Sequence, residues 1–453
     1  MNRGRSFLIL IVLALAIGAY IYFVESKRDP LETTAKAKVF AGLEPGTLEE
    51  IEVKADSGEV TRIRKQDGDW QIVQPAGVPG DSAKTSSLAS TLEALEEQRV
   101  VSENPSSLAS FGLEPPRIAV AFRKAGETEM RRLLVGTKTP TGSDLYAKVD
   151  SQPKVFLIAS FLEDSLNQTT FDLREKSALT FARDGVDALR LEAAGSPALA
   201  FAKKGDTWRL TAPVSASADF AAVDGIVSRL FQAQMKSIAA DDVGSDAAKY
   251  GFDKPQATAT IGLGSTQATL VIGAKQDDTS VYARDLSRPL VFTVESTLLD
   301  ELEKKPEDVR RKDVFAFRSF NATSLELTYG GKTFTFAKQP AAADPNASAG
   351  ADVWKMTSPE AKDVDQAALT TLMSALSNLR AESFADKPVT GGEDLVVVAR
   401  HGDAAAPSED RATIRKSGDT AHAIVTGEPG AFVLAAADVD NVLKQVKDLV
   451  GIK

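Results

Sequence analysis

The chain of 453 residues has no cysteine and only two histidines, His401 and His422. The absence of cysteine excludes disulfide bonds, thiol catalysis and thiolate metal sites. Two histidines leave almost no room for a metal site built from several imidazoles. No cluster of lysine and arginine with interleaved aromatic residues is present, and the formal net charge is −10. Because nonspecific binding to nucleic acid needs clustered positive charge, we expect no nucleic-acid partner.

The longest apolar run lies at residues 7–24, with the sequence FLILIVLALAIGAYIYFV and neither a charge nor a proline. As a helix, this run would extend about 27 Å, close to the roughly 30 Å hydrocarbon core of a bilayer. Tyr20 and Tyr22 suit the aromatic belt of a membrane interface. We therefore predict a transmembrane anchor over residues 1–24, with the lipid bilayer as a partner, and a charged spacer over residues 25–39.

A cleaved signal peptide is the alternative interpretation of this run, with Ala14-Leu15-Ala16 as the cleavage site. Cleavage there would leave an apolar mature N-terminus, so we favour a retained anchor. Positive charges stand on both sides of the run and do not decide its orientation. A short tail inside the cell and a large exported part is the commoner arrangement. We therefore expect a single-pass membrane protein whose C-terminal part lies outside the cytoplasm.

All three tryptophans open the same pattern, W-x-h-x-x-P, where h is apolar, and an aspartate stands six residues after each proline. Apolar residues seven and eleven positions beyond the aspartate would lie on one face of a helix. We predict a strand around each tryptophan and a helix near each aspartate, whose carboxylate accepts free backbone N–H groups. The residues are Trp70, Pro75 and Asp81, then Trp208, Pro213 and Asp219, then Trp354, Pro359 and Asp365.

A second signature follows in each copy: a ring and an alanine, then a proline and a phenylalanine at the same spacing. In the third copy a histidine replaces the tyrosine, so we interpret this histidine as a ring in a repeated strand rather than as a catalytic base. Two aligned signatures in three copies indicate a threefold repeat. The second set of anchors is Tyr146 and Phe156, Tyr282 and Phe292, and His422 and Phe432.

The first copy contains seven segments with strand signals, joined by tight turns, and two segments with helix signals, near residues 82–97 and 160–167. Such short connections leave no room for parallel crossovers. We predict an α+β fold: one N-terminal transmembrane helix, then three tandem repeats of a mostly antiparallel sheet packed with two helices. The modules are expected at residues 40–176, 177–313 and 314–453, and the third is divergent.

Matches to catalytic and cofactor-binding motifs are poor. Residues 262–267 approximate a dinucleotide loop, but the third glycine is missing and a strand is expected to follow. Ser151 and Lys154 fit an S-x-x-K pattern, yet they precede a strand rather than open a helix. No pair of carboxylates stands in an apolar setting that would raise a pKa for acid–base work. We expect no catalytic, cofactor-binding or metal-binding residues, and therefore no enzyme and no cofactor.

Four features of the sequence together suggest a family: the apolar N-terminus, the DGDWQIVQP strand at residues 67–75, the FGLEPP turn at residues 111–116 and the YA…P..VF segment. In these features the chain resembles the domain-of-unknown-function family 4340. The resemblance covers nearly the whole chain after residue 39 and is strongest over the first two copies, because the third loses the glycine turn and the tyrosine. The family is bacterial and is often encoded beside an ABC-type transporter similar to the gliding-motility export system. The resemblance implies an inner-membrane protein with its large part in the periplasm or outside the cell, and transporter subunits as partners.

Three functions follow from these observations. The first is a non-catalytic accessory or scaffold protein of an ABC-type transport or export complex. The second is a module that binds cell-wall or surface polysaccharide, which would need exposed aromatic rings. The third is an envelope hydrolase with a site between modules, which would need convergent polar groups and a carboxylate or histidine with a shifted pKa.

Overall fold

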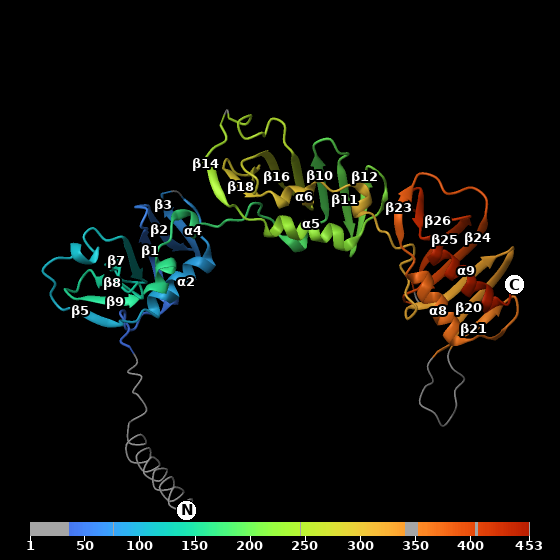
Figure 1. Ribbon diagram of the computed structural model, residues 1–453, viewed down its shortest axis with the longest axis horizontal. Helices are drawn as coiled ribbons and strands as arrows, with labels where there is room; N and C mark the ends of the chain where they lie inside the picture. The colour runs from blue at the N-terminus through green and yellow to red at the C-terminus, as the bar shows by residue number, and fades with distance from the viewer. Residues whose placement is uncertain (1–35, 76, 245, 340–351, 404–405, 453) are drawn as a thin grey trace, which may run out of the picture. The chain divides into compact units, whose positions relative to one another are not determined.

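The structure is a computed structural model that describes residues 36–75, 77–244, 246–339, 352–403 and 406–452. In this part of the chain the strands form three nine-stranded sheets with the same strand order, shown in Figure 1 from blue through green to red. The predicted repeat is confirmed at the level of the sheet. The chain divides into two compact units: the first, up to Lys176, holds the first sheet, and the second, from Ser177 on, holds the other two.

The first sheet has the order β4-β3-β2-β1-β6-β7-β8-β9-β5, and its strand pairs are antiparallel. Strands form because apolar residues alternate with polar ones: in β3, Trp70 and Ile72 are buried and their neighbours are not. The strands are β1 (Leu48–Lys54), β2 (Val60–Gln66), β3 (Asp69–Gln74), β4 (Val78–Pro79), β5 (Arg99–Ser102), β6 (Ile118–Lys124), β7 (Arg131–Lys138), β8 (Asp144–Val149) and β9 (Val155–Ala159).

The two halves of the first sheet meet where β1 pairs with β6. Ile51 lies opposite Phe122 and Val53 opposite Val120, and all four side chains are fully buried. Leu88 of the connecting helix packs on the same core. Burying a side chain of this size contributes about 1.5–3 kcal/mol, so each residue of this central pairing helps to stabilise the module. The helices of the module are α2 (Ser82–Glu93), α3 (Glu163–Leu166) and α4 (Thr170–Leu173).

The second sheet repeats this order as β13-β12-β11-β10-β15-β16-β17-β18-β14. At its centre Leu189 of one half lies opposite Ile261 of the other, both buried. Its elements are β10 (Ala188–Ala193), β11 (Leu199–Lys204), β12 (Thr207–Ala212), β13 (Ala216–Ser217), α5 (Phe220–Gln232), β14 (Ser237–Ala240), β15 (Ala257–Leu263), β16 (Thr266–Lys275), β17 (Ser280–Asp285), β18 (Val291–Glu295), α6 (Thr297–Leu302) and α7 (Pro306–Val309).

The third sheet has the order β22-β21-β20-β19-β24-β25-β26-β27-β23, with Leu327 opposite Val397 at its centre. Its closing helix is one long element rather than two short ones. The elements are β19 (Ala322–Tyr329), β20 (Lys332–Gln339), β21 (Val353–Ser358), β22 (Lys362–Asp363), α8 (Gln366–Ser377), β23 (Ala381–Ala385), β24 (Glu393–His401), β25 (Ser408–Ser417), β26 (Thr420–Val425), β27 (Ala431–Leu434) and α9 (Ala436–Val450).

The predicted α+β fold is wrong, because the described part of the chain is mostly β, with helices in the minority. Each module adds two edge strands to the seven predicted, and in the first module these have two and four residues, too short for alternation to show. The closing helix predicted near residues 160–167 is interrupted. A new helix begins after Thr169 because its side chain and that of Asp172 cap each other's backbone N–H groups.

The predicted transmembrane helix is not part of this architecture. Among the described residues, no helix combines the length and the apolar composition needed to cross a bilayer. Residues 1–35, which include the predicted anchor and most of the predicted spacer, lie outside the described residues. The corrected fold is therefore three tandem antiparallel sheets with a few covering helices.

The aspartate that caps each long helix is expected to contribute measurably to stability. Asp219 accepts the Ala222 N–H at 3.0 Å, so Asp219→Ala should lower the free energy of unfolding of the second module by about 1 kcal/mol. Asp278→Ala, at an exposed turn of the same module, should change it by less than about 0.5 kcal/mol. Urea denaturation followed by Trp208 fluorescence, with Trp70 and Trp354 replaced by phenylalanine, measures both. Equal effects of the two variants would refute the capping role.

Candidate functional site

The three tryptophans lie on β3, β12 and β21 and are covered on both sides. Trp70, Trp208 and Trp354 are only 6%, 4% and 5% exposed. The ammonium groups of Lys203 and Lys338 lie over the second and third rings, 5.7 and 5.9 Å from the ring centres. Buried rings of this kind stabilise a core but are closed to stacking on a sugar.

The repeated prolines and aspartates form the turn between each tryptophan strand and its helix. Pro75, Pro213 and Pro359 each follow a cis peptide bond. The aspartates are the N-caps of α2, α5 and α8, and each carboxylate is engaged by the first turn of its helix. The cap distances are 2.9 Å from Lys84 N to Asp81, 3.0 Å from Ala222 N to Asp219, and 2.9 and 3.0 Å from Ala367 N and Ala368 N to Asp365.

The rings of the second signature lie on β8, β17 and β26 and hold the segment that covers this end of each sheet. The Tyr146 ring lies 5.0 Å from Phe111, and the Tyr282 ring 5.1 Å from Tyr250. In the third module, His422 Nδ1 instead accepts the backbone N–H of Val389 at 2.8 Å. A hydrogen bond thus replaces a ring contact at the same position of the sheet. The following phenylalanines, on the neighbouring strands, are fully buried: Phe156, Phe292 and Phe432.

The only other histidine of the sequence also has a structural setting. His401 Nε2 lies 3.3 Å from a carboxylate oxygen of Asp410. That same oxygen accepts the backbone N–H groups of Ala316 and Phe317 at 2.7 and 2.8 Å. The carboxylate therefore holds the segment that enters the third module. Among the described residues, no group of three or more histidines, aspartates or glutamates is arranged to hold a metal ion.

The outer face of the first sheet carries paired charges that the repeat signatures do not include. Glu50 lies between two arginines, 3.2 Å from Arg64 Nη2 on β2 and 2.7 Å from Arg123 Nη2 on β6. Burial acts to raise the pKa of Glu50, but the hydrogen bonds from Arg123 and Arg64 outweigh it and hold that pKa below its ordinary value. In the next row Arg62 pairs with Glu52. Period-two alternation in β1 and β2 is the sequence signal that could have placed these side chains opposite the core.

The same row of the other two sheets has different chemistry, although the strands and register correspond. Small side chains replace both the glutamate and its partners in the second sheet, and only one arginine remains in the third. The fold is thus repeated while the outer surface is not. The residues of this row are Ala202, Ala188 and Gly262 in the second sheet, and Ala337, Ser324 and Arg400 in the third.

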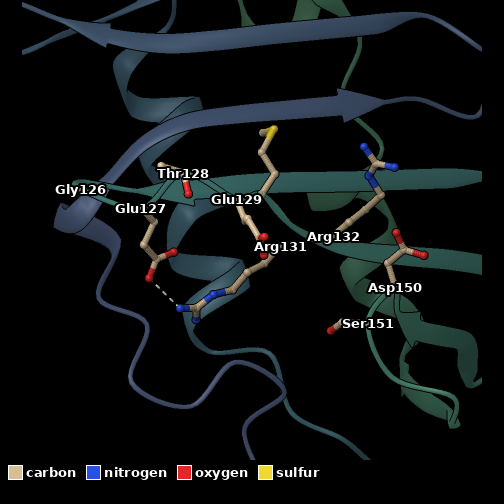
Figure 2. Close-up of a pocket in the computed structure, with 9 residues that line it drawn as sticks. Gly126, Glu127, Thr128, Glu129, Arg131, Arg132, Asp150 and Ser151 are labelled. Carbon is tan, nitrogen blue, oxygen red and sulfur yellow. Dashed lines mark hydrogen bonds and ion pairs between the residues drawn. The ribbon is translucent and has the colours of Figure 1, made fainter.

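A shallow hollow of about 620 Å³ adjoins the charged face, between the β6–β7 turn and the turn after β8. Figure 2 shows the Glu127 carboxylate directed at the Arg131 guanidinium, and the two groups lie 2.8 Å apart. Arg132, Asp150 and Ser151 complete this polar lining. Each charge either has an opposite charge nearby or faces solvent, so the hollow presents groups for recognition and not an activated nucleophile.

A second group of charges joins the second and third sheets within their common unit. Arg310 belongs to a run of three basic residues, 310–312, just before the start of the third module, yet it is only 9% exposed. Its guanidinium carbon lies 3.7 Å from the centre of the Phe384 ring, and Nη2 donates to the Pro429 carbonyl at 3.0 Å. Glu428 accepts the Ser217 N–H at 3.0 Å. Burial lowers the pKa of Arg310, while Glu428 and Glu307 oppose this, and an arginine remains charged throughout.

Removal of the Glu50 charge tests whether the charged face stabilises the first module. Glu50→Gln should lower its free energy of unfolding by about 1–3 kcal/mol, because two arginines lose a charged acceptor. Glu49→Gln, at a more exposed position 3.5 Å from Arg123, should cost less than about 0.5 kcal/mol.

The decrease in the free energy of unfolding caused by Glu50→Gln should also depend on pH. Urea denaturation followed by Trp70 fluorescence at a series of pH values measures it. Since the pKa of Glu50 is lowered in the fold, its contribution is present above the unfolded pKa near 4.5 and disappears as pH falls through the folded pKa. A difference between the wild type and Glu50→Gln that stays constant down to pH 3 would contradict this assignment.

Replacement of Arg310 tests the link between the second and third modules. Arg310→Ala should lower the urea midpoint of the third module, because a buried cation–π contact and a hydrogen bond are lost. We expect its free energy of unfolding to fall by about 2–4 kcal/mol. Arg380→Ala removes only exposed pairs at 3.6 and 3.8 Å and should cost less than about 1 kcal/mol. Trp354 fluorescence, with the other two tryptophans replaced by phenylalanine, measures both. An unchanged midpoint in Arg310→Ala would show that the modules unfold independently.

Comparisons with known proteins identify the family of this chain but give no activity. No curated protein matches the chain in sequence. A crystal structure of a DNA polymerase sliding clamp from Pseudomonas aeruginosa with a ligand matches at 8% identity over 88% of this chain and 93% of the clamp. Its TM-score of 0.16 is too low to indicate a shared fold. The family described as Domain of unknown function (DUF4340) matches residues 70–207 and 208–396. These matches cover most of the chain and include all three tryptophan signatures, so the chain belongs to the DUF4340 family.

Proposed function

We propose that the protein is a non-catalytic accessory or scaffold protein of an ABC-type transport or export complex in the bacterial envelope. One observation carries the proposal. The residues repeated in all three modules are core side chains, helix caps and supports of the covering segment. On the outer face, the row that carries Glu50 in the first sheet has different side chains in the other two. A repeated fold with unlike surfaces suits a protein that presents several contacts to a large assembly.

Tandem linkage strengthens such contacts without any single tight site. When modules are joined in one chain, binding of the first raises the effective concentration of the next, so individually weak contacts add to a firm association. The buried Arg310 contact supports this, because it keeps the second and third surfaces within one unit. The charged face around Glu50 gives the first module a polar contact that the other two do not share.

The proposed location is the bacterial inner membrane, with the three sheets in the periplasm or outside the cell. The apolar sequence of residues 7–24 supports attachment to the bilayer, and the absence of cysteine is compatible with an oxidising compartment. In this arrangement the sheets lie beside the exported parts of a membrane complex, where contacts with transporter subunits form.

The two other hypotheses have less support. Polysaccharide binding through the tryptophans conflicts with their burial. The hydrolase hypothesis calls for convergent polar groups and a carboxylate or histidine whose pKa is shifted to suit acid–base work. Every carboxyl group for which the described residues produce a clear shift has a lowered pKa, as Glu163 does beside Lys138 and Arg117.

Affinity capture of the full chain from membranes in mild detergent tests the proposal. Transporter subunits identified by mass spectrometry should copurify with the wild type. The double variant Arg64→Glu and Arg132→Glu should recover fewer of them, because it reverses two exposed charges of the first face. Lys65→Glu with Lys332→Glu changes charge equally at exposed positions outside that row and should recover them as the wild type does. A clean absence of transporter subunits from the wild-type capture would overturn the proposal.

A further inference from the structure

In the first two modules, the chain that leaves the module completes one edge of the sheet. The Pro79 carbonyl of β4 accepts the Glu175 N–H at 2.9 Å, and the Asp81 N–H donates to the Leu173 carbonyl at 2.8 Å. The second module repeats the arrangement. There the Ser217 carbonyl of β13 accepts the Arg311 N–H at 2.9 Å, and the Asp219 N–H donates to the Val309 carbonyl at 2.8 Å.

The two segments that complete these edges share their chemistry. Each runs antiparallel to the edge and carries an aliphatic residue followed by an arginine: Leu173-Arg174 in the first module and Val309-Arg310 in the second. Leu173 and Val309 are 0% and 1% exposed. The edge is therefore built to take an extended segment whose aliphatic side chain enters the core.

The corresponding edge of the third sheet is open. Leu449 follows Phe432 at the same distance along the chain as Leu173 follows Phe156, but it lies within helix α9 and is only partly buried. A continuous helix cannot offer the backbone groups of an extended segment. Among the described residues, no backbone group pairs with the Asp363 carbonyl or the Asp365 N–H, the counterparts of the groups engaged in the other modules. Both aspartates are exposed.

A hollow of about 610 Å³ lies along this open edge. Its apolar wall includes Val364, Ala368 and Leu449. Its rim carries three carboxylates, Asp363, Asp365 and Asp448, beside the ammonium group of Lys362. An aliphatic side chain matches the wall, and the excess of negative charge on the rim favours an arginine. The hollow thus fits a segment in which an aliphatic residue precedes an arginine, as in the segments that complete the first two edges.

We propose that the β22 edge of the third module binds an extended segment of a partner protein as an added antiparallel strand, with an aliphatic residue followed by arginine. Main-chain hydrogen bonds to Asp363 and Asp365 fix the register of the added strand, and the hollow selects which side chains the strand can carry. This site adds a defined contact to the proposed scaffold function, and its test needs no transporter subunit, so either proposal can fail without the other.

The probe is a fluorescein-labelled peptide with the sequence of residues 304–313, which contains Val309 and Arg310, and the titrant is the purified full-length protein. Anisotropy should show saturable binding. Ala368→Trp fills the hollow and should weaken binding at least about tenfold, or about 1.4 kcal/mol. Ala367→Trp places the same ring at an exposed neighbouring position of α8 and should leave binding unchanged.

Changes in the peptide separate this binding from general attraction between a basic peptide and an acidic protein. The peptide with Val309→Asp should lose binding, the peptide with Arg310→Ala should weaken it several-fold, and the reversed sequence, with the same charge, should not bind. No saturable binding, or binding that tolerates Ala368→Trp or Val309→Asp, would overturn the proposal.

A cross-link gives a second readout that does not depend on a filled core. Because the chain has no cysteine, Asp363→Cys introduces a single thiol at the edge. Under mild oxidation this thiol should form a disulfide with the peptide that carries Arg311→Cys. In the second module the Arg311 N–H donates to the Ser217 carbonyl, which is the counterpart of the Asp363 carbonyl. Lys332→Cys, at the exposed first residue of β20, should not form this disulfide. Equal cross-linking at both positions would contradict a specific edge site.

Discussion

One backbone contact organises each of the first two modules: the N–H of the capping aspartate bonds to the carbonyl of the aliphatic residue that ends the module. Asp81 and Asp219 use their side chains to begin a helix and their main chains to receive Leu173 and Val309. The contact ties the tryptophan strand, the helix and the exit of the chain to one point.

The repeat could be predicted from the sequence because its residues act locally. The tryptophans mark alternating strands, and the aspartates precede helices at fixed spacing, so both patterns survive without knowledge of distant contacts. The edge strands could not be predicted, since β4 and β13 have two residues each, too few for an alternation of apolar and polar residues to show. The interruption of the closing helix depends on the mutual capping of Thr169 and Asp172, a side-chain detail that overrides the helical pattern.

The burial and pairing of charged residues are less evident from the sequence than the positions of the core residues. Arg310 belongs to a charged run, 310–312, at the boundary of the second and third modules, yet it is buried against Phe384 of the third module. The sequence cannot show this, because the ring that accepts the guanidinium is far along the chain. Period-two alternation predicts that Glu50 and its neighbours lie on the outer face of the sheet. It does not predict which charges pair across β2, β1 and β6, because that depends on the register of the strands. Buried pairing, rather than charge count, distinguishes these residues.

The three modules share a fold and differ in what they present. The first offers a charged face, the second offers small side chains on the corresponding row, and the third leaves an edge uncovered because α9 continues where its counterparts turn into extended chain. An exposed edge strand is a pairing site that proteins normally cover or blunt. Its presence on a folded module is the basis of the proposed partner site at β22.

Amide hydrogen exchange of the full-length protein tests this account most directly, because it observes the three aspartate N–H groups in one sample. The account predicts slow exchange at Asp81 and Asp219, which bond to Leu173 and Val309, and fast exchange at Asp365, which has no such partner among the described residues. Protection of Asp365 equal to that of the other two, in the protein without a partner, would contradict it.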